Sequence, residues 1–106
     1  MPKFMIQASY SADGLKGLQK DKASGRRAAV SNAVEGLGGK LDAVYYAFGE
    51  DDAIAILDLP NNVSASALSL AISAAGLVRT KTTVLMTVEE TDEALQKSVS
   101  YRAPGR

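Results

Sequence analysis

The chain has 106 residues and contains neither cysteine nor histidine. Without cysteine it can form no disulfide and has no thiol nucleophile. Without histidine it lacks the commonest general base, the usual zinc and haem ligand, and the serine triads that depend on an imidazole. An enzyme made from this sequence would have to rely on carboxylate, tyrosine, lysine or arginine chemistry. We therefore lean against an enzyme and expect no metal or other cofactor.

Charge of one sign and long apolar runs are lacking as well. The 12 basic and 12 acidic residues cancel, and they form no block of five like charges. A general electrostatic attraction to nucleic acid or to an anionic membrane is therefore not expected. No apolar run approaches the ~20 residues needed to cross a bilayer, and the N-terminus lacks the long apolar stretch of a secretion signal. The sequence predicts a soluble cytoplasmic protein of bacterial type with no nucleic-acid or membrane partner.

What the sequence does contain is a predicted β-hairpin at residues 40–60, in which two apolar runs meet at Gly49-Glu50-Asp51-Asp52. Counted outward from this turn, Phe48 is expected opposite Ala53, and the alternation of strand side chains defines two faces. One face receives Val44, Tyr46, Phe48, Ala53, Ala55 and Leu57, and the other receives Tyr45, Ala47, Ile54 and Ile56. Because neither face is polar, this strand pair has to be covered on both sides.

The segment before the hairpin predicts a strand followed by a helix. Residues 3–10 alternate in the manner of a strand. Ser11 is placed to cap a helix that begins near Ala12, is interrupted in the polar stretch 20–25 and ends at Gly38-Gly39. Arg26 and Arg27, just after the interruption, are expected on a solvated face.

The segment after the hairpin predicts a helix, a strand and a second, shorter helix. Residues 63–75 are rich in alanine and serine, and residues 77–88 are rich in β-branched side chains. Residues 89–100 form a short amphipathic pattern, with Leu95 and Val99 expected to turn inward. The chain thus predicts a single domain, residues 1–106 with about 101–106 as a flexible tail. Its order is that of an α+β, ferredoxin-like βαββαβ fold with a four-stranded antiparallel sheet.

In such a fold the two longer helices cover one face of the sheet, and nothing in the same chain is expected to cover the other. With strands ~4.8 Å apart and ~20 Å long, that face measures about 400 Å², worth roughly 10 kcal/mol if it is apolar and becomes buried. Met5, Leu85 and one of the neighbouring tyrosines Tyr45 and Tyr46 argue against a wetted surface. We therefore predict a homodimer or higher homo-oligomer that forms through this face.

The residues Tyr45-Tyr46-Ala47-Phe48 before the turn, and the apolar strand after it, resemble the signature region of the GYD domain family, small proteins of mostly unassigned function. The similarity extends over nearly the whole chain, through Gly38-Gly39-Lys40-Leu41, the alanine- and serine-rich helix, and Val78-Arg79-Thr80-Lys81-Thr82. The sequence departs from the family at the tyrosine for which the family is named, because that position holds Asp51. The resemblance implies the dimeric α/β-barrel form of the ferredoxin-like fold and implies no particular reaction or ligand.

Two groups of residues are candidates for ligand binding. Tyr10, Tyr45 and Tyr46 can line a pocket between sheet and helices, although a buried tyrosine more often only packs and finds a partner for its hydroxyl. Glu50, Asp51 and Asp52 place three carboxylates on one turn, where a solvated turn is favoured over a cation site. A functional variant of the second group has Glu50 or Asp52 reaching a basic residue, either Arg79 or Lys81, in the same or a partner chain.

Three functions remain open on the sequence alone. The favoured one is a non-enzymatic, homo-oligomeric module that binds a small molecule between sheet and helices. The second is a cofactor-free oxygenase or isomerase of the dimeric α/β-barrel type that uses Tyr10, Tyr46 and either Arg79 or Lys81 around a pocket. The third is a regulatory subunit whose helix at residues 63–75 docks a partner protein.

Overall fold

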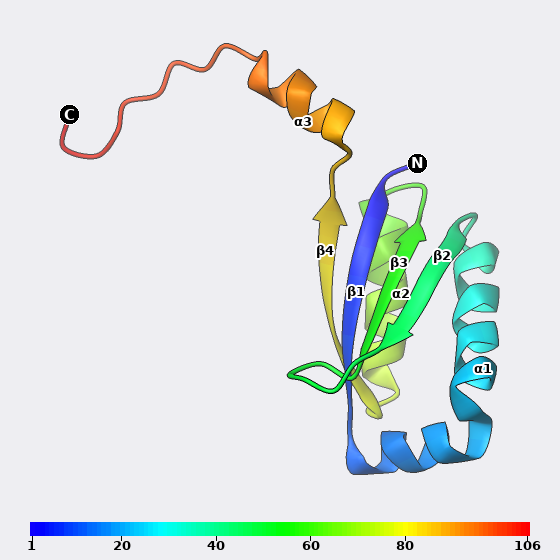
Figure 1. Cartoon of the computed structure of the whole chain (residues 1–106). Helices are drawn as coiled ribbons and strands as arrows, with labels where there is room; N and C mark the ends of the chain where they lie inside the picture. Colours follow the sequence, from blue (N-terminus) through cyan, green and yellow to red (C-terminus); the bar gives the residue numbers. More distant parts are fainter.

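A computed structural model describes all residues, 1–106, and confirms the ferredoxin-like α+β order (Figure 1). Its elements are β1 (Lys3–Tyr10), α1 (Ala12–Gly36), β2 (Lys40–Tyr46), β3 (Ala53–Asp58), α2 (Asn62–Ala74), β4 (Val78–Leu85) and α3 (Val88–Leu95). The four strands form one antiparallel sheet in the order β2-β3-β1-β4. None of the helices combines the length and the apolarity that crossing a bilayer would require.

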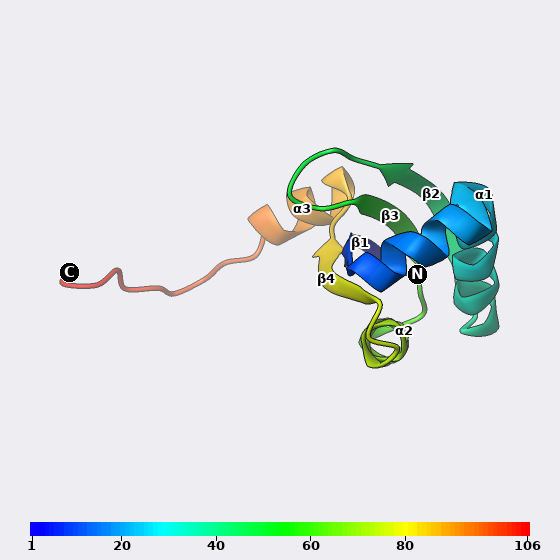
Figure 2. The same ribbon diagram turned by 90° about the horizontal axis from the view of Figure 1, so that it is seen from below.

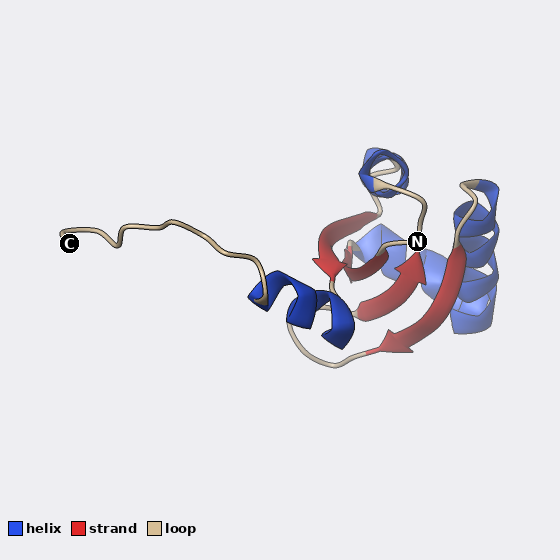
Figure 3. Ribbon diagram, turned by 90° about the horizontal axis from the view of Figure 1, so that it is seen from above, coloured by secondary structure: helices blue, strands red, loops and turns tan.

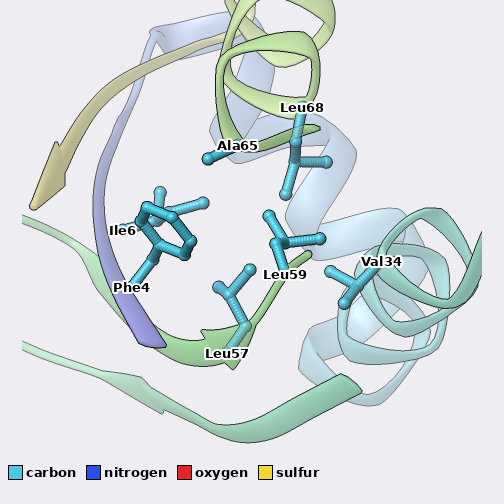
Figure 4. Close-up of a cluster of buried hydrophobic side chains, with 7 residues drawn as sticks. All are labelled: Phe4, Ile6, Val34, Leu57, Leu59, Ala65 and Leu68. Carbon is cyan, nitrogen blue, oxygen red and sulfur yellow. The ribbon is translucent and has the colours of Figure 1, made fainter. Parts of the chain in front are cut away.

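Helices α1 and α2 lie on the same side of the curved sheet (Figures 2 and 3). Between them and the strands lies one buried cluster (Figure 4), made of Phe4, Ile6, Val34, Leu57, Leu59, Ala65 and Leu68. The cluster draws Phe4 and Ile6 from β1 because alternate side chains of a strand point to the same face. Val34 comes from α1 and Leu68 from α2, so the same few residues hold both helices against the sheet.

Helix α1 is bent, as the polar stretch predicted. Ser11 caps it, since its hydroxyl accepts a hydrogen bond from the Gly14 backbone N–H at 3.0 Å. At Lys22 the backbone leaves the helical region, with φ at 65°, and the helix then resumes in a new direction. Beyond its end Gly38 has φ at 83°, a conformation that glycine adopts without strain.

The hairpin register differs from the prediction by two residues. Tyr46, and not Phe48, lies opposite Ala53. The connection is wider than the tetrapeptide, because the Ala47 N–H donates to the Asp52 carbonyl at 2.9 Å and Phe48 projects fully into solvent. A shift of two residues keeps the strand side chains in their predicted two sets. The structure adds which set faces the helices, since Tyr46 lies on the helix side and Tyr45 on the other.

Strand β2 contains a bulge at which its pairing with β3 shifts by one residue. Leu41 pairs with Leu57 and Ala43 pairs with Ile56, which leaves Asp42 as the extra residue. The Asp42 carboxylate bonds to the Lys3 ammonium, which also lies 2.9 Å from Asp58 Oδ1. These two carboxylates raise the pKa of Lys3 through hydrogen bonds and charge. Lys3 thereby links strands β1, β2 and β3 at one end of the sheet.

The face of the sheet away from α1 and α2, here called the open face, has no helix packed on it (Figure 3). The register assigns to it the apolar side chains of Met5, Ala43, Tyr45, Ile54, Ile56 and Leu85 and the polar side chains of Gln7, Ser9, Arg79, Lys81 and Thr83. Tyr45 is 66% exposed there. As predicted, the sheet has one face that helices cover and one face that no helix covers.

The prediction for the last helix is wrong in one respect. A capping box between Thr87 and Glu90 starts α3 at Val88, one residue earlier than predicted, and α3 ends at Leu95. Leu95 and Val99 do not turn inward, since each is 77% exposed. After Leu85 the chain leads away from the sheet (Figure 1), so nothing of its own lies within reach of these side chains.

Candidate functional site

A partly enclosed, mainly apolar crevice of about 70 Å³ lies between the sheet and the two longer helices. Its walls are small or branched apolar side chains, among them Ala8, Val30, Val44, Ala55 and Ile72. Small residues on β1 and β3 leave the room that bulky residues would fill. The crevice is the place at which the sequence predicted a ligand pocket.

Two of the three candidate tyrosines meet at this crevice. Tyr10 is the last residue of β1 and Tyr46 the last of β2, and their hydroxyl oxygens lie 3.4 Å apart. Desolvation by burial, with the hydrogen bond to Tyr10 as a second cause, raises the pKa of Tyr46 to about 12. At neutral pH Tyr46 is therefore a neutral phenol, which can donate and accept a hydrogen bond but does not act as a base.

Arg26 adds a positive charge to the same site. It follows the bend at Lys22, which turns the second part of α1 across the sheet and brings Arg26 and Arg27 to the crevice. The Arg26 side chain is 34% exposed and lies 3.8 Å from Asp21, a loose pairing that leaves most of its donors free. The expectation of a solvated face thus fails for Arg26, because the direction of a helix after a bend cannot be read from periodicity.

The remaining candidates lie on the opposite side of the sheet. Tyr45, Arg79 and Lys81 belong to the open face, and the sheet separates them from Tyr10 and Tyr46. A single chain therefore does not bring Arg79 or Lys81 together with the two crevice tyrosines, as the enzyme hypothesis required.

The carboxylate that reaches Lys81 is Asp51, and not Glu50 or Asp52 as the sequence suggested. Asp51 Oδ2 lies 3.2 Å from Lys81 Nζ, and the same carboxylate accepts from Gln7 Nε2 at 3.1 Å and from Ser9 Oγ at 3.2 Å. Its side chain is only 12% exposed. These contacts hold the β2–β3 connection across the end of β1.

Asp52 and Glu50, the other two carboxylates of the turn, have different surroundings from Asp51. Asp52 Oδ2 accepts the Tyr10 backbone N–H at 2.8 Å, which fixes the end of β1 beside the crevice. Glu50 and Arg79 make no ion pair, although both border a polar hollow of about 300 Å³ next to Asp51. No three carboxylates converge in an arrangement that could hold a metal ion.

The family model of the GYD domain matches residues 4–95, from β1 through α3. The chain belongs to the GYD domain family. Comparison with curated proteins gave no match, and comparison with solved structures gave none. The matched range contains both halves of the crevice and the whole open face.

In this GYD domain the departure at Asp51 has a structural role. The position at which the resemblance to the family expects tyrosine here holds a carboxylate with three contacts, to Lys81 and to the polar side chains of Gln7 and Ser9 on β1. A tyrosine could not accept these three contacts at once as an anion does. The residue at position 51 therefore anchors the connection in this chain, at a distance from the crevice tyrosines.

Proposed function

We propose that this GYD domain is a homodimeric module that binds a small organic anion in the crevice between sheet and helices. The observation that carries the proposal is the pair of tyrosine hydroxyls, 3.4 Å apart, at an otherwise apolar crevice that Arg26 also lines. Two hydroxyl groups and the guanidinium groups of Arg26 and Arg27 beside an apolar wall suit a ligand with an apolar body and one carboxylate-like group.

The size of the crevice limits that ligand. Sites for drug-sized ligands usually measure about 300–1,000 Å³. A space of about 70 Å³ therefore admits a compound of a few heavy atoms, or one end of a longer compound. Short-chain carboxylates meet both the size and the polarity of the site.

Binding is better supported than catalysis. The residues that line the crevice include two tyrosines and two arginines, but no carboxylate, lysine or histidine. General acid–base catalysis works best with a group whose pKa lies near the working pH, whereas the pKa of Tyr46 is about 12 and arginine stays charged. The crevice can hold and orient a ligand, and Tyr46 is not suited to act as a base near neutrality.

The dimer is proposed to form through the open face. Tyr45, Ile54 and Ile56 form a continuous apolar strip across β2 and β3, and each Å² of apolar surface that becomes buried there is worth about 25 cal/mol. A second copy of the same face is self-complementary under two-fold symmetry. The sheet lies between the two proposed surfaces, so the dimer leaves each crevice free.

Light scattering after gel filtration tests the assembly at micromolar concentration. The native chain is expected to have the mass of a dimer, and Tyr45→Glu is expected to reduce it to a monomer. Val63→Glu is the matched control, because Val63 is 78% exposed at the start of α2 on the helix side, where a carboxylate is tolerated. A native monomer, or a Tyr45→Glu variant that dimerises as the control does, would refute the proposed interface.

Heteronuclear NMR with the straight-chain carboxylates from acetate to hexanoate tests the ligand. We expect shift changes at the amides of residues that line the crevice, with affinity rising along the series until the space is filled. The double variant Tyr10→Phe with Tyr46→Phe should weaken binding about tenfold or more, as the loss of charge-assisted hydrogen bonds predicts. Tyr45→Phe is the matched control and should bind as the native chain does. Shifts confined to other surfaces would contradict the proposal.

A further inference from the structure

The structure leaves one segment that carries exposed apolar side chains and has no buried residue. It consists of residues 86–106, here called the C-terminal arm, which contains α3 and leads away from the sheet (Figures 1 and 3). We infer that the C-terminal arm packs against a second copy of the chain and forms part of the dimer interface. This inference rests on the proposed homodimer and adds to it a second surface.

Helix α3 has a complete N-terminal cap even though none of its residues is buried. Thr87 Oγ1 accepts the Glu90 N–H at 3.0 Å, and Glu90 Oε1 accepts the Thr87 N–H at 2.9 Å. These hydrogen bonds also lower the pKa of Glu90. An isolated helix as short as α3, which has eight residues, is marginal in water, and most helices in proteins owe their stability to packing of an apolar side. The complete capping box therefore indicates a helix that is used against another surface.

Two exposed apolar side chains lie on one side of α3. Val88 and Leu95 are seven residues apart, which places them on one side of α3, and they are 74% and 77% exposed. Val99 and Tyr101 continue the apolar series beyond the helix, at 77% and 75% exposure. The GYD family match runs to residue 95 and so includes α3. The helix is thus part of the domain and not an appendage to it.

Continuity with the open face points to a second copy as the occupant. The arm begins directly after Leu85, whose side chain the register assigns to the open face. Any body that covers the open face at the end of β4 therefore adjoins the start of the arm. The acidic side chains of α3, which include Glu89 and Glu93, are also opposite in charge to Arg79 of the open face, which makes no ion pair within its own chain.

The area needed for a stable dimer supports the same occupant. A standard interface buries about 800 Å² on each partner, and the open face alone offers about 400 Å². Full burial of one large apolar side chain removes about 80 Å² from water. The five exposed apolar side chains of the arm, which are Met86, Val88, Leu95, Val99 and Tyr101, would add about 400 Å². The two surfaces together reach the size of a standard interface, and neither reaches it alone.

The test compares two double variants of the full chain by sedimentation equilibrium. Leu95→Glu with Val99→Glu places two charges on the apolar side of the arm, and Gln96→Glu with Ser98→Glu places two charges at neighbouring positions off that side. All four residues are exposed, so neither variant disturbs the folded core. We expect the first variant to dimerise at least tenfold more weakly than the native chain and the control to change less than twofold.

The outcomes separate this inference from the proposed dimer. A native chain that is monomeric would overturn both. A native dimer with equal dissociation constants for the two variants would overturn the role of the arm and leave the open-face dimer intact. Hydrogen exchange gives an independent reading, because amides of α3 should become protected only as concentration rises through the dissociation constant. Protection that does not depend on concentration would mean that the arm folds back on its own chain, and lack of protection in the dimer would mean that it stays free.

Discussion

Substitution of Gly14 by alanine is expected to destabilise the protein by about 2–4 kcal/mol. Gly14 lies in the first turn of α1 and is buried where the helix crosses the start of β4. A Cβ at this position would lie far inside contact distance of the Leu77 carbonyl oxygen, a backbone atom, and 3.2 Å from Cδ1 of Tyr10. The helix would have to move away by something on the order of 1 Å, which is typical of costly overpacking.

The magnitude follows from what that movement would break. Leu77 O accepts two hydrogen bonds from Ser11, from its N–H at 2.9 Å and from its hydroxyl at 3.1 Å. Each such bond is worth about 1 kcal/mol, and overpacking adds about 1–3 kcal/mol, against a helix-propensity gain of about 0.5–1 kcal/mol from alanine. Because Tyr10 is in contact with the added methyl group, the crevice should also lose affinity for its ligand.

Urea denaturation followed by circular dichroism measures this effect, since the chain has no tryptophan to report by fluorescence. All samples need the same protein concentration, because a dimer would make the midpoint concentration-dependent. Gly17→Ala is the matched control: nothing lies within 4 Å of a Cβ there, so it should stabilise by about 0.5–1 kcal/mol. If Gly14→Ala is as stable as Gly17→Ala, the close approach of α1 to Leu77 is not present in solution.

Three further predictions follow from the ionisable groups. Because the fold raises the pKa of Tyr46 from 10.0 to about 12, the unfolded chain loses this proton first and stability falls between pH 10 and 12; Tyr46→Phe should reduce that fall in alkaline urea titrations. Asp51→Ala should cost about 2 kcal/mol, as expected for hydrogen bonds to a charged group, and Glu50→Ala less than about 0.5 kcal/mol; equal losses would refute the assigned contacts. Lys3→Met should cost at most about 1 kcal/mol at pH 7, since its side chain is 36% exposed. Because the raised pKa of Lys3 favours its charged form in the fold, that cost should be full below pH 10.5 and shrink above it.

The faces of the sheet could be predicted from the sequence, whereas the pairing of the strands could not. Side chains alternate with period two, so Tyr45 and Tyr46 had to point to opposite sides whichever residues they faced across the hairpin. The pairing itself depends on the width of the connection, and Asp52 widens it by directing its carboxylate to Tyr10 and its N–H to Ala8. Those are contacts with another strand, which no local turn pattern contains.

The candidate site could be predicted in part for the same reason. Tyr10 and Tyr46 could be predicted as pocket residues because both belong to segments whose alternation marks them as strands. The place of Arg26 could not be predicted, because it depends on the bend at Lys22, a single residue at φ 65° in a stretch that the sequence marks only as weakly helical. Asp51 was passed over because three adjacent carboxylates look alike in sequence, and only the path of the chain distinguishes the one that turns toward Lys81.

The separation of the two tyrosines determines how ligand and assembly can influence each other. Tyr46 belongs to the crevice and Tyr45 to the open face, and they are neighbours on the same strand. No side chain spans the sheet, so a ligand at Tyr46 can act on a partner at Tyr45 only by shifting the backbone of β2. That strand is bulged at Asp42 and lies at the edge of the sheet, paired on one side only. Since Tyr46 and Tyr45 are both carried by β2, this strand is the element through which binding and dimerisation would be coupled.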